Sequence, residues 1–187
     1  MHQQFMFQPH LPKLPNELVR SILDNSNEYI NAQYFKEGTG RNINIGGETV
    51  TSGLNKCKNA PDDLKQWVTK NITKHWANIG TVETDTDKTK PIIGAHIDRM
   101  RNYDLLYPIQ TGGPDVYTVF YRVKDPQKRE AFFYNDYSQL EEIARVKIPQ
   151  NTWCVFNTKT IHSVEGLDST RITVQVGLWD YVGLPDL

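Results

Sequence analysis

The chain has 187 residues and a mass of 21.6 kDa, a length that fits one domain with a core of its own. Hydrophobic residues make up 38% and charged residues 23%, which is the balance of a globular protein and excludes a disordered or fibrous one. The formal net charge is -1, from 21 Lys and Arg against 22 Asp and Glu. Duplex-DNA binders usually carry a basic excess, so no nucleic-acid partner is expected.

The sequence predicts no membrane association. No apolar run approaches the roughly 20 residues of a membrane-spanning helix. Residues 1–15 carry neither a continuous apolar block nor a basic flank, so no secretory signal is expected. Cys57 and Cys154 are the only cysteines, and two thiols without a secretory signal are typical of reduced cysteines in the cytosol. We therefore expect a cytoplasmic protein.

The first part of the chain, residues 1–80, is predicted to be a helical support region. A first helix is expected over residues 17–23, whose apolar residues fall on one face. A second helix is expected from Pro61 onward, because the two aspartates that follow suit the positive end of a helix dipole. Its apolar stripe consists of Leu64, Trp67, Val68 and Ile72. Residues 31–58 are expected to be loops with one short strand at residues 43–45.

Beyond residue 91 the pattern changes to short alternating stretches separated by turn residues. Strands are predicted at residues 92–98, 116–123, 131–134, 145–148, 153–156, 161–164 and 171–179. Residues 81–90 are expected to be a loop, and residues 102–114 a loop of the kind that forms active-site lids. The sequence thus predicts a single, mainly β domain in which helices pack on a β-sandwich or barrel.

Three side chains in the strand-rich region have the chemistry and spacing of a metal site. His96 and Asp98 are two residues apart on a predicted strand, so both point to the same face. His162 stands beside a later strand. Two imidazoles and one carboxylate leave the opposite face of a metal open, which suits non-haem Fe(II), although zinc and manganese accept the same donors. An H-x-D spacing also arises by chance, in which case His96 is a surface histidine near a turn carboxylate.

The residues after His162 predict a basic group near the same site. If residues 166–167 centre a hairpin, Arg171 faces His162 on the neighbouring strand, with Cβ atoms about 5 Å apart and on the same side. Thr173 shares that face, and the apolar residues that alternate with it take the other face as core. This pairing would place a guanidinium and a hydroxyl beside the metal ligands.

A buried Arg171 requires an anionic partner, and the sequence leaves two possibilities open. The first is a structural ion pair with Glu165, Asp168 or another carboxylate of the chain. The second is the distal end of a bound dicarboxylate, which a guanidinium fork and the hydroxyl of Thr173 would hold.

Together these residues resemble the motif of the Fe(II)- and 2-oxoglutarate-dependent oxygenase superfamily. That motif is H-x-D, then a distant histidine, then a basic residue that is often followed by x-S or x-T. Here it is His96-x-Asp98, His162 and Arg171-x-Thr173. Residues 149–157 also resemble the turn and apolar strand that precede the second histidine, and the resemblance covers roughly residues 91–179.

The resemblance implies a double-stranded β-helix, the jelly-roll barrel of cupin-like proteins, over residues 91–180. It implies that the two histidines and the aspartate ligate catalytic Fe(II), and that Arg171 with Thr173 binds the distal carboxylate of 2-oxoglutarate. In prolyl-hydroxylase-like members a tyrosine on the strand after H-x-D reaches the same carboxylate. Tyr121 is the best match for it, with packing in an aromatic core as the alternative.

The implied activity is that of a dioxygenase with O₂ as a partner, which releases succinate and CO₂ and hydroxylates a substrate C–H bond. The carboxylate of Asp98 argues against halogenation. The substrate is left open between a small molecule, a free amino acid and a protein side chain, and between the prolyl- and aspartyl/asparaginyl-hydroxylase-like branches. Arg101 shares strand parity with Asp98 and is a candidate substrate contact, with a surface ion pair as the alternative.

Two other functions are compatible with the same residues. One is a cupin-like metalloenzyme that does not use 2-oxoglutarate, in which Arg171 forms a structural ion pair. The other is a metal-free jelly-roll binding module, in which His96 and His162 do not meet.

Overall fold

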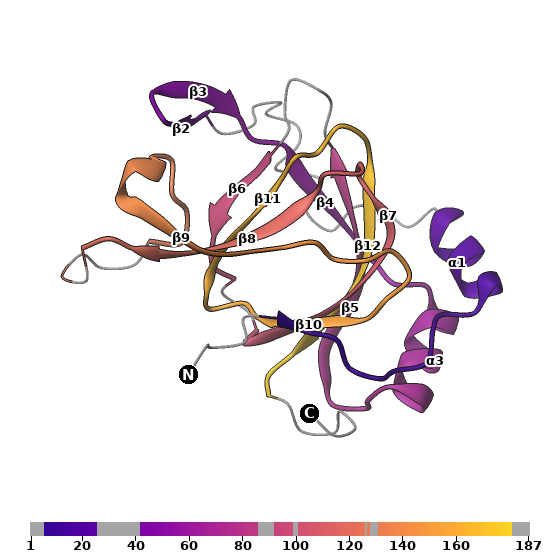
Figure 1. Cartoon of the computed structure of the whole chain (residues 1–187). Helices are drawn as coiled ribbons and strands as arrows, with labels where there is room; N and C mark the ends of the chain where they lie inside the picture. The colour runs from indigo at the N-terminus through magenta and orange to yellow at the C-terminus, as the bar shows by residue number, and fades with distance from the viewer. Residues whose placement is uncertain are drawn as a thin grey trace.

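The computed structural model describes residues 6–25, 42–85, 92–98, 101–125, 127 and 131–180. Two antiparallel sheets face each other, and two helices lie side by side along the outer face of the larger sheet (Figure 1). The helices are α1 (Asn16–Leu23) and α3 (Asp62–Asn71). A short 3-10 turn, η1 (Tyr137–Gln139), directly precedes the strand that begins at Leu140. Neither α1 nor α3 has the length or the apolar character of a membrane-spanning helix.

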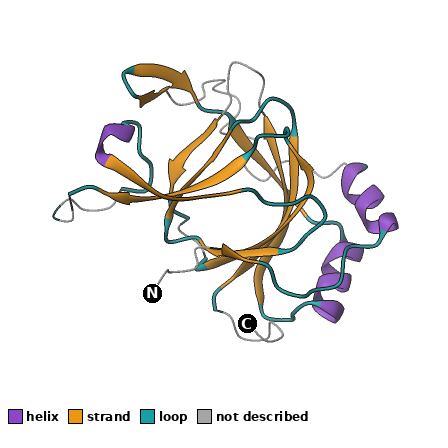
Figure 2. Cartoon of the chain, in the orientation of Figure 1, coloured by secondary structure: helices purple, strands orange, loops and turns teal. Residues whose placement is uncertain are grey.

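The larger sheet consists, in spatial order, of β1 (Met6–Phe7), β10 (Cys154–Asn157), β7 (Tyr103–Thr111), β12 (Arg171–Leu178), β5 (Trp76–Asp85) and β4 (Leu54–Asn59). The smaller sheet consists of β6 (Ile92–His96), β11 (Ile161–Glu165), β8 (Tyr117–Val123) and β9 (Leu140–Val146). A separate hairpin joins β2 (Asn42–Ile45) to β3 (Glu48–Thr51). All these pairings are antiparallel, and strands dominate the chain (Figure 2).

The order of the strands is that of a double-stranded β-helix. From β5 to β8 the chain alternates between the larger and the smaller sheet, and from β9 to β12 it alternates again. Each sheet therefore receives strands from both halves of the chain, which is the winding of a jelly roll. The mainly β fold class predicted from the sequence is confirmed.

The apolar core lies mainly between the larger sheet and the helices. Leu18 and Ile22 of α1 and Leu64 and Val68 of α3 are buried against the outward-facing residues of β7 and β12. Burial of each such side chain stabilises the fold by about 1.5–3 kcal/mol. On β12 the period of two places alternate residues on opposite faces, so the apolar residues at 172, 174 and 176 face the helices.

The residues that alternate with them on β12 face the space between the two sheets. Arg171 and Thr173 are buried there, and Gln175 follows on the same face. The predicted division of β12 into an apolar face and a face with Arg171 and Thr173 is therefore correct.

Several predicted elements differ from the structure. The helical support region of residues 1–80 also contains four strands and the start of a fifth, because β5 begins at Trp76 and continues through the predicted loop up to residue 85. The predicted lid at residues 102–114 is largely β7. Six consecutive residues of β7, 104–109, are buried, so the strand lacks the alternation by which strands are detected. Residues 131–134 form no named strand, although Phe133 makes an isolated bridge to His96.

The predicted hairpin between His162 and Arg171 is wrong. β11 pairs with β6 and β8 in the smaller sheet, whereas β12 pairs with β5 and β7 in the larger one. The turn at Gly166 therefore carries the chain from one sheet to the other. Both side chains still face the space between the sheets, because each strand keeps its own alternation.

Gly166 is expected to be required for this crossing. Its φ of 79° is favourable only for glycine, and a Cβ would overlap the carbonyl oxygen of Asp115. Gly166→Ala should therefore destabilise the protein by more than about 1 kcal/mol in urea unfolding. Gly47→Ala is the matched control, since Gly47 also has a positive φ of 91° but no atom within 4 Å of its Cβ position. Equal losses in the two variants would contradict the steric argument.

Candidate metal centre

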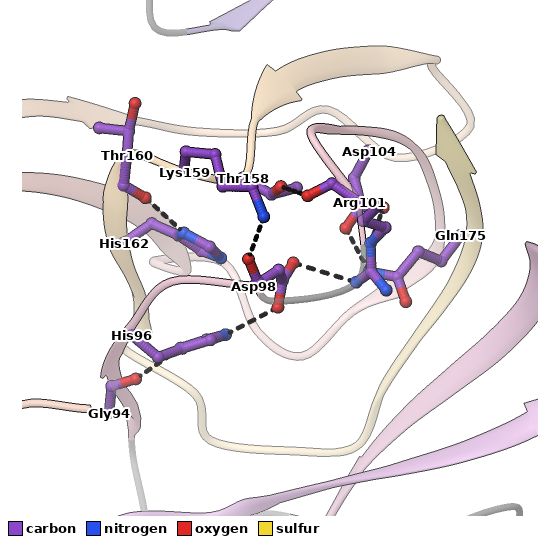
Figure 3. A network of polar contacts seen from close by, with 10 residues as sticks. All are labelled: Gly94, His96, Asp98, Arg101, Asp104, Thr158, Lys159, Thr160, His162 and Gln175. Carbon is purple, nitrogen blue, oxygen red and sulfur yellow. Dashed lines mark hydrogen bonds and ion pairs between the residues drawn. The ribbon is translucent and has the colours of Figure 1, made fainter. Parts of the chain in front are cut away.

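The structure brings His96, Asp98 and His162 together at one end of the smaller sheet. His96 ends β6 and pairs directly with His162 on β11, and their ring centroids are 4.5 Å apart. Asp98 follows two residues after His96, just beyond the strand. One ligand atom from each of the three side chains lies within 4.8 Å of the other two, the spacing that a single metal ion requires (Figure 3).

Hydrogen bonds fix the orientation of both imidazoles. Nδ1 of His96 lies 2.8 Å from the carbonyl oxygen of Gly94, and Nδ1 of His162 lies 2.9 Å from that of Thr160. A carbonyl oxygen only accepts, so each Nδ1 carries the proton and each Nε2 presents its lone pair. This is the arrangement in which metal-binding histidines are usually held.

Asp98 is held by its backbone and by its carboxylate. Its N–H donates to the carbonyl of Thr158 at 3.0 Å, and its own carbonyl accepts from Nζ of Lys159 at 2.7 Å. Oδ1 lies 3.8 Å from Nε2 of His96, and Oδ2 accepts from Arg101 at 3.0 Å. Burial alone would raise the pKa of Asp98, but Arg101 and the nearby histidines lower it below its usual value. The carboxylate is therefore ionised at neutral pH.

His162 lies deep between the sheets, with 4% of its surface exposed. The rings of Phe120 and Phe156 pack against it, with centroids 6.5 and 4.9 Å away. Burial, together with His96, lowers the pKa of His162 to about 3. His162 is therefore neutral at pH 7 and available as a ligand without first losing a proton.

The stability of the metal-free protein should depend on this histidine in acid. Because its folded pKa is about 3 and its unfolded pKa about 6.5, the unfolded chain binds more protons between these values, so stability falls as pH falls from about 6.5 to 3. The test compares the protein with His162→Asn, whose side-chain amide can still donate an N–H to the carbonyl oxygen of Thr160. The difference in unfolding free energy should change by up to about 1.4 kcal/mol per pH unit. A pH-independent difference in urea unfolding would contradict the shift.

Arg171 lies in a pocket between the two sheets. The pocket is lined by Arg171 itself and by Pro108, Thr111, Val116, Thr118 and Ile148. Thr118 is two residues from Phe120 on β8, and Phe120 pairs with His162, so Thr118 and Phe120 share the inner face with this candidate metal ligand. Arg171 and His162 therefore face the same enclosed space from opposite sheets.

Arg171 has no protein anion as a partner within the described ranges. It is 8% exposed, and burial lowers its pKa to about 10 with no carboxylate close enough to oppose that shift. The hydroxyl of Thr173 is buried two residues further along the same face, and it too finds no hydrogen-bond partner in the described part of the chain. A guanidinium and a hydroxyl are thus both left to satisfy an anion in this space.

Tyr121 lies on the opposite face of β8. It pairs with Ile161 and packs against Tyr137, with ring centroids 5.4 Å apart, outside the space that holds Arg171. Its hydroxyl donates to the carboxylate of Glu165. The expectation that Tyr121 reaches the same anion as Arg171 is therefore contradicted, because Tyr121 has the strand parity opposite to that of Phe120, and the alternative of aromatic packing holds.

Arg101 differs from the sequence expectation as well. Its guanidinium forms ion pairs with Asp98 and with Asp104, which is fully buried at the start of β7. It therefore forms a largely buried ion-pair network and not a surface ion pair, and its contact with a substrate stays a prediction. Burial raises the pKa of Asp104, an effect that Arg101 opposes.

The sequence alone did not identify three further residues near the candidate metal ligands. Asp104 could have been noticed in the sequence, because it is a charged residue within an otherwise apolar strand. Gln175 lies on the inner face of β12 and donates to Asp104 at 2.5 Å. Phe133, 48% exposed, stacks on the ring of His96 at 6.0 Å between centroids. Strand parity places Gln175 on the same face as Arg171 and Thr173, but its contact with Asp104, like the position of Phe133 on His96, depends on strands distant in the sequence.

No family model and no curated protein matches the sequence. Among solved structures, the chain resembles a prolyl-4-hydroxylase of Pseudomonas putida at 12% identity and a TM-score of 0.45, over 95% of this chain and 94% of that one. It also resembles an oxidoreductase of the 2OG-Fe(II) oxygenase family from Burkholderia pseudomallei at 9% identity and a TM-score of 0.43, over 96% and 100%. These likenesses are too distant to assign a family, so function must be argued from the chain's own residues.

Proposed function

We propose that the protein is an Fe(II)- and 2-oxoglutarate-dependent dioxygenase that hydroxylates a substrate not yet identified. The observation that carries the proposal is Arg171, a buried cation without a protein anion, on the inner face that also holds the metal-binding cluster. A buried charge is costly unless it is paired. A bound dicarboxylate with one end at the metal and the other at Arg171 accounts for both features.

The donor set fits the metal. Two neutral imidazole nitrogens and one carboxylate, from His96, His162 and Asp98, form the facial set typical of non-haem Fe(II) sites with open positions. The two Nε2 atoms are already oriented by the hydrogen bonds to Gly94 and Thr160, so little reorganisation is needed on binding.

The inner face of β12 fits the co-substrate. Gln175 stands at the end near the metal, where it contacts Asp104, and Arg171 stands at the other end with Thr173 between them. Arg171 would bind the distal carboxylate as a fork, and the hydroxyl of Thr173 would donate to the same group. The apolar residues Val116 and Ile148 of the pocket would keep water from this ion pair.

When bound, the metal supplies the oxidative decarboxylation of 2-oxoglutarate by O₂, which releases succinate and CO₂ and hydroxylates a substrate C–H bond. The residues of the chain would bind and orient the metal and the co-substrate. His96, Asp98 and His162 would hold the metal, and Phe120 and Phe156 would keep water from the inner wall beside it.

The two other functions fit less well. A cupin-like enzyme that does not use 2-oxoglutarate gives Arg171 no anion, because none of the described carboxylates pairs with it. A metal-free binding module leaves the convergence of His96, Asp98 and His162 without a purpose.

The deciding experiment is an anaerobic titration of 2-oxoglutarate into the Fe(II)-loaded protein. A saturable visible metal-to-ligand charge-transfer band is expected, with succinate formed once O₂ is admitted. Iron binding without the band would support the cupin-like alternative. If no iron binds, the three side chains are not a metal site and the proposal fails.

A further inference from the structure

A charged network that the proposed reaction does not use directly adjoins the metal-binding cluster. Arg101 bridges two carboxylates, one from the metal-binding cluster and one from the core (Figure 3). One of its nitrogens lies 3.0 Å from Oδ2 of Asp98, and its Nε contacts Oδ1 of Asp104. Gln175 then donates to Oδ2 of Asp104 at 2.5 Å. The network thus runs from the inner face of β12 to a metal-binding carboxylate.

The backbone around this network holds Arg101 in one position. Its carbonyl accepts from the hydroxyl of Thr158 at 2.7 Å, and the carbonyl of Thr158 in turn accepts from the N–H of Asp98. Gly177 of β12 lies directly beneath the side chain, and a Cβ there would be 2.7 Å from Cδ of Arg101. The backbone of Arg101 and the aliphatic part of its side chain are therefore held in place beside Asp98.

Stability alone is a poor explanation for this arrangement. Asp104 is fully buried, and taking such a carboxylate and a guanidinium out of water costs as much as their attraction returns. If Asp104 were absent, Asp98 would still be ionised and hydrogen-bonded at the end of β6. Asp104 and Gln175 instead hold the guanidinium of Arg101 in one orientation, and Asp104 compensates its positive charge.

We infer that Arg101 is a positioning residue that limits Asp98 to a single metal-binding oxygen, and that Asp104 keeps Arg101 from neutralising that oxygen. Arg101 occupies Oδ2, so only Oδ1, which faces Nε2 of His96 at 3.8 Å, is left for a metal. A carboxylate bound through one oxygen leaves one more open position on the metal than a bidentate one. The inference rests on the metal site of the proposed function.

The charges support the same assignment. Asp98 and Arg101 by themselves sum to zero, which would weaken the attraction for a dication. When Asp104 is ionised the three groups sum to -1, so the negative charge at Oδ1 of Asp98 is retained. Oδ1 of Asp104 forms an ion pair with the guanidinium of Arg101, and Oδ2 accepts a hydrogen bond from Gln175.

The test uses Mn²⁺ alone with the full-length protein and counts the water molecules on the bound ion by water-proton relaxation. Three protein ligands on six-coordinate Mn²⁺ leave three waters. In Arg101→Gln, Asp98 is free to bind through both oxygens, so the relaxivity per bound Mn²⁺ should fall by about a third. Arg101→Lys restores a donor to Oδ2 and should restore most of the lost relaxivity. Arg122→Gln, which breaks an exposed ion pair with Glu141, is the control and should change nothing.

Asp104→Asn and Gln175→Leu test the other end of the network. Each should weaken Mn²⁺ binding by about tenfold or more while the number of bound waters stays at three. Because both variants leave the guanidinium in place, they test the charge-compensating role of Asp104 even if Arg101→Gln does not fold, and Arg101→Lys then tests the contact with Oδ2. Thermal unfolding without metal shows whether each variant is folded.

The outcomes separate the two proposals. If the unsubstituted protein binds no Mn²⁺, the metal site fails and the inference fails with it. If it binds Mn²⁺ and Arg101→Gln has the same relaxivity and affinity, the proposed function stands and only the positioning role is overturned. Unchanged Mn²⁺ affinity in both Asp104→Asn and Gln175→Leu would overturn the charge-compensating role of Asp104.

Discussion

Replacing His96 with alanine is expected to weaken Fe(II) and Mn²⁺ binding by more than about a hundredfold, because loss of a partner behind a metal ligand already costs 10- to 100-fold. The remaining imidazole and carboxylate would not hold the ion against water. The side chain of His96 is only 16% exposed, and Phe133 stacks on it, so a modest loss of stability is expected as well. Metal affinity is measured by anaerobic titration and stability by thermal unfolding.

The control for this prediction is His75→Ala. His75 is exposed at the end of the segment after α3 and lies outside the cluster, so its loss should leave metal binding unchanged. Metal affinity that survives in His96→Ala would mean that the ion binds elsewhere. In that case the convergence of His96, Asp98 and His162 would be a structural packing feature only.

Replacing Arg171 with methionine is expected to have two opposite effects. The affinity for 2-oxoglutarate should fall by about 2–5 kcal/mol, or roughly 30- to several-thousand-fold, because the distal carboxylate loses its buried cation. The stability of the protein without ligand should rise, because a buried charge without a protein partner is replaced by an apolar chain of similar length. Co-substrate affinity is followed by the charge-transfer band and stability by urea unfolding.

The two readouts distinguish a binding role from a structural one. A structural arginine would lose stability on replacement and leave the band unchanged, which would return the protein to the cupin-like alternative. Arg122→Met, at an exposed ion pair, serves as the control for removing a positive charge and should affect neither measurement. Thr173→Val removes the buried hydroxyl at almost constant volume. It should raise the 2-oxoglutarate concentration at which the charge-transfer band is half-saturated, without lowering stability.

Local patterns in the sequence predicted the parts of the fold that alternate visibly. β12 is an example, since its apolar residues face the helices while Arg171 and Thr173 face inward. The helix after Pro61 was likewise predicted from its aspartates and apolar stripe. In contrast, β7 is buried on both faces and has no alternation to detect. β5 lies in a polar stretch, and its strand character comes from pairing with β4 and β12.

The candidate site shows the same division. The spacing of His96 and Asp98 placed both on one face, and the structure brings His162 to them. Arg171 was placed on the correct face for an incorrect reason, because β11 and β12 lie in different sheets and do not form a hairpin. Tyr121 was matched to the family's tyrosine by resemblance alone, whereas the register of β8 with β11 places it on the face opposite to Phe120.

The sequence by itself therefore determined the strand-rich class, the three metal-binding candidates and the basic residue with its hydroxyl neighbour. It did so because side-chain direction along a strand repeats every two residues and is a local property. The tertiary structure alone decided which sheet each strand joins, and with it that Arg171 lacks a protein anion and that Arg101 joins Asp98 to Asp104. Those contacts depend on hydrogen-bond pairing between strands far apart in the chain, which no local pattern encodes.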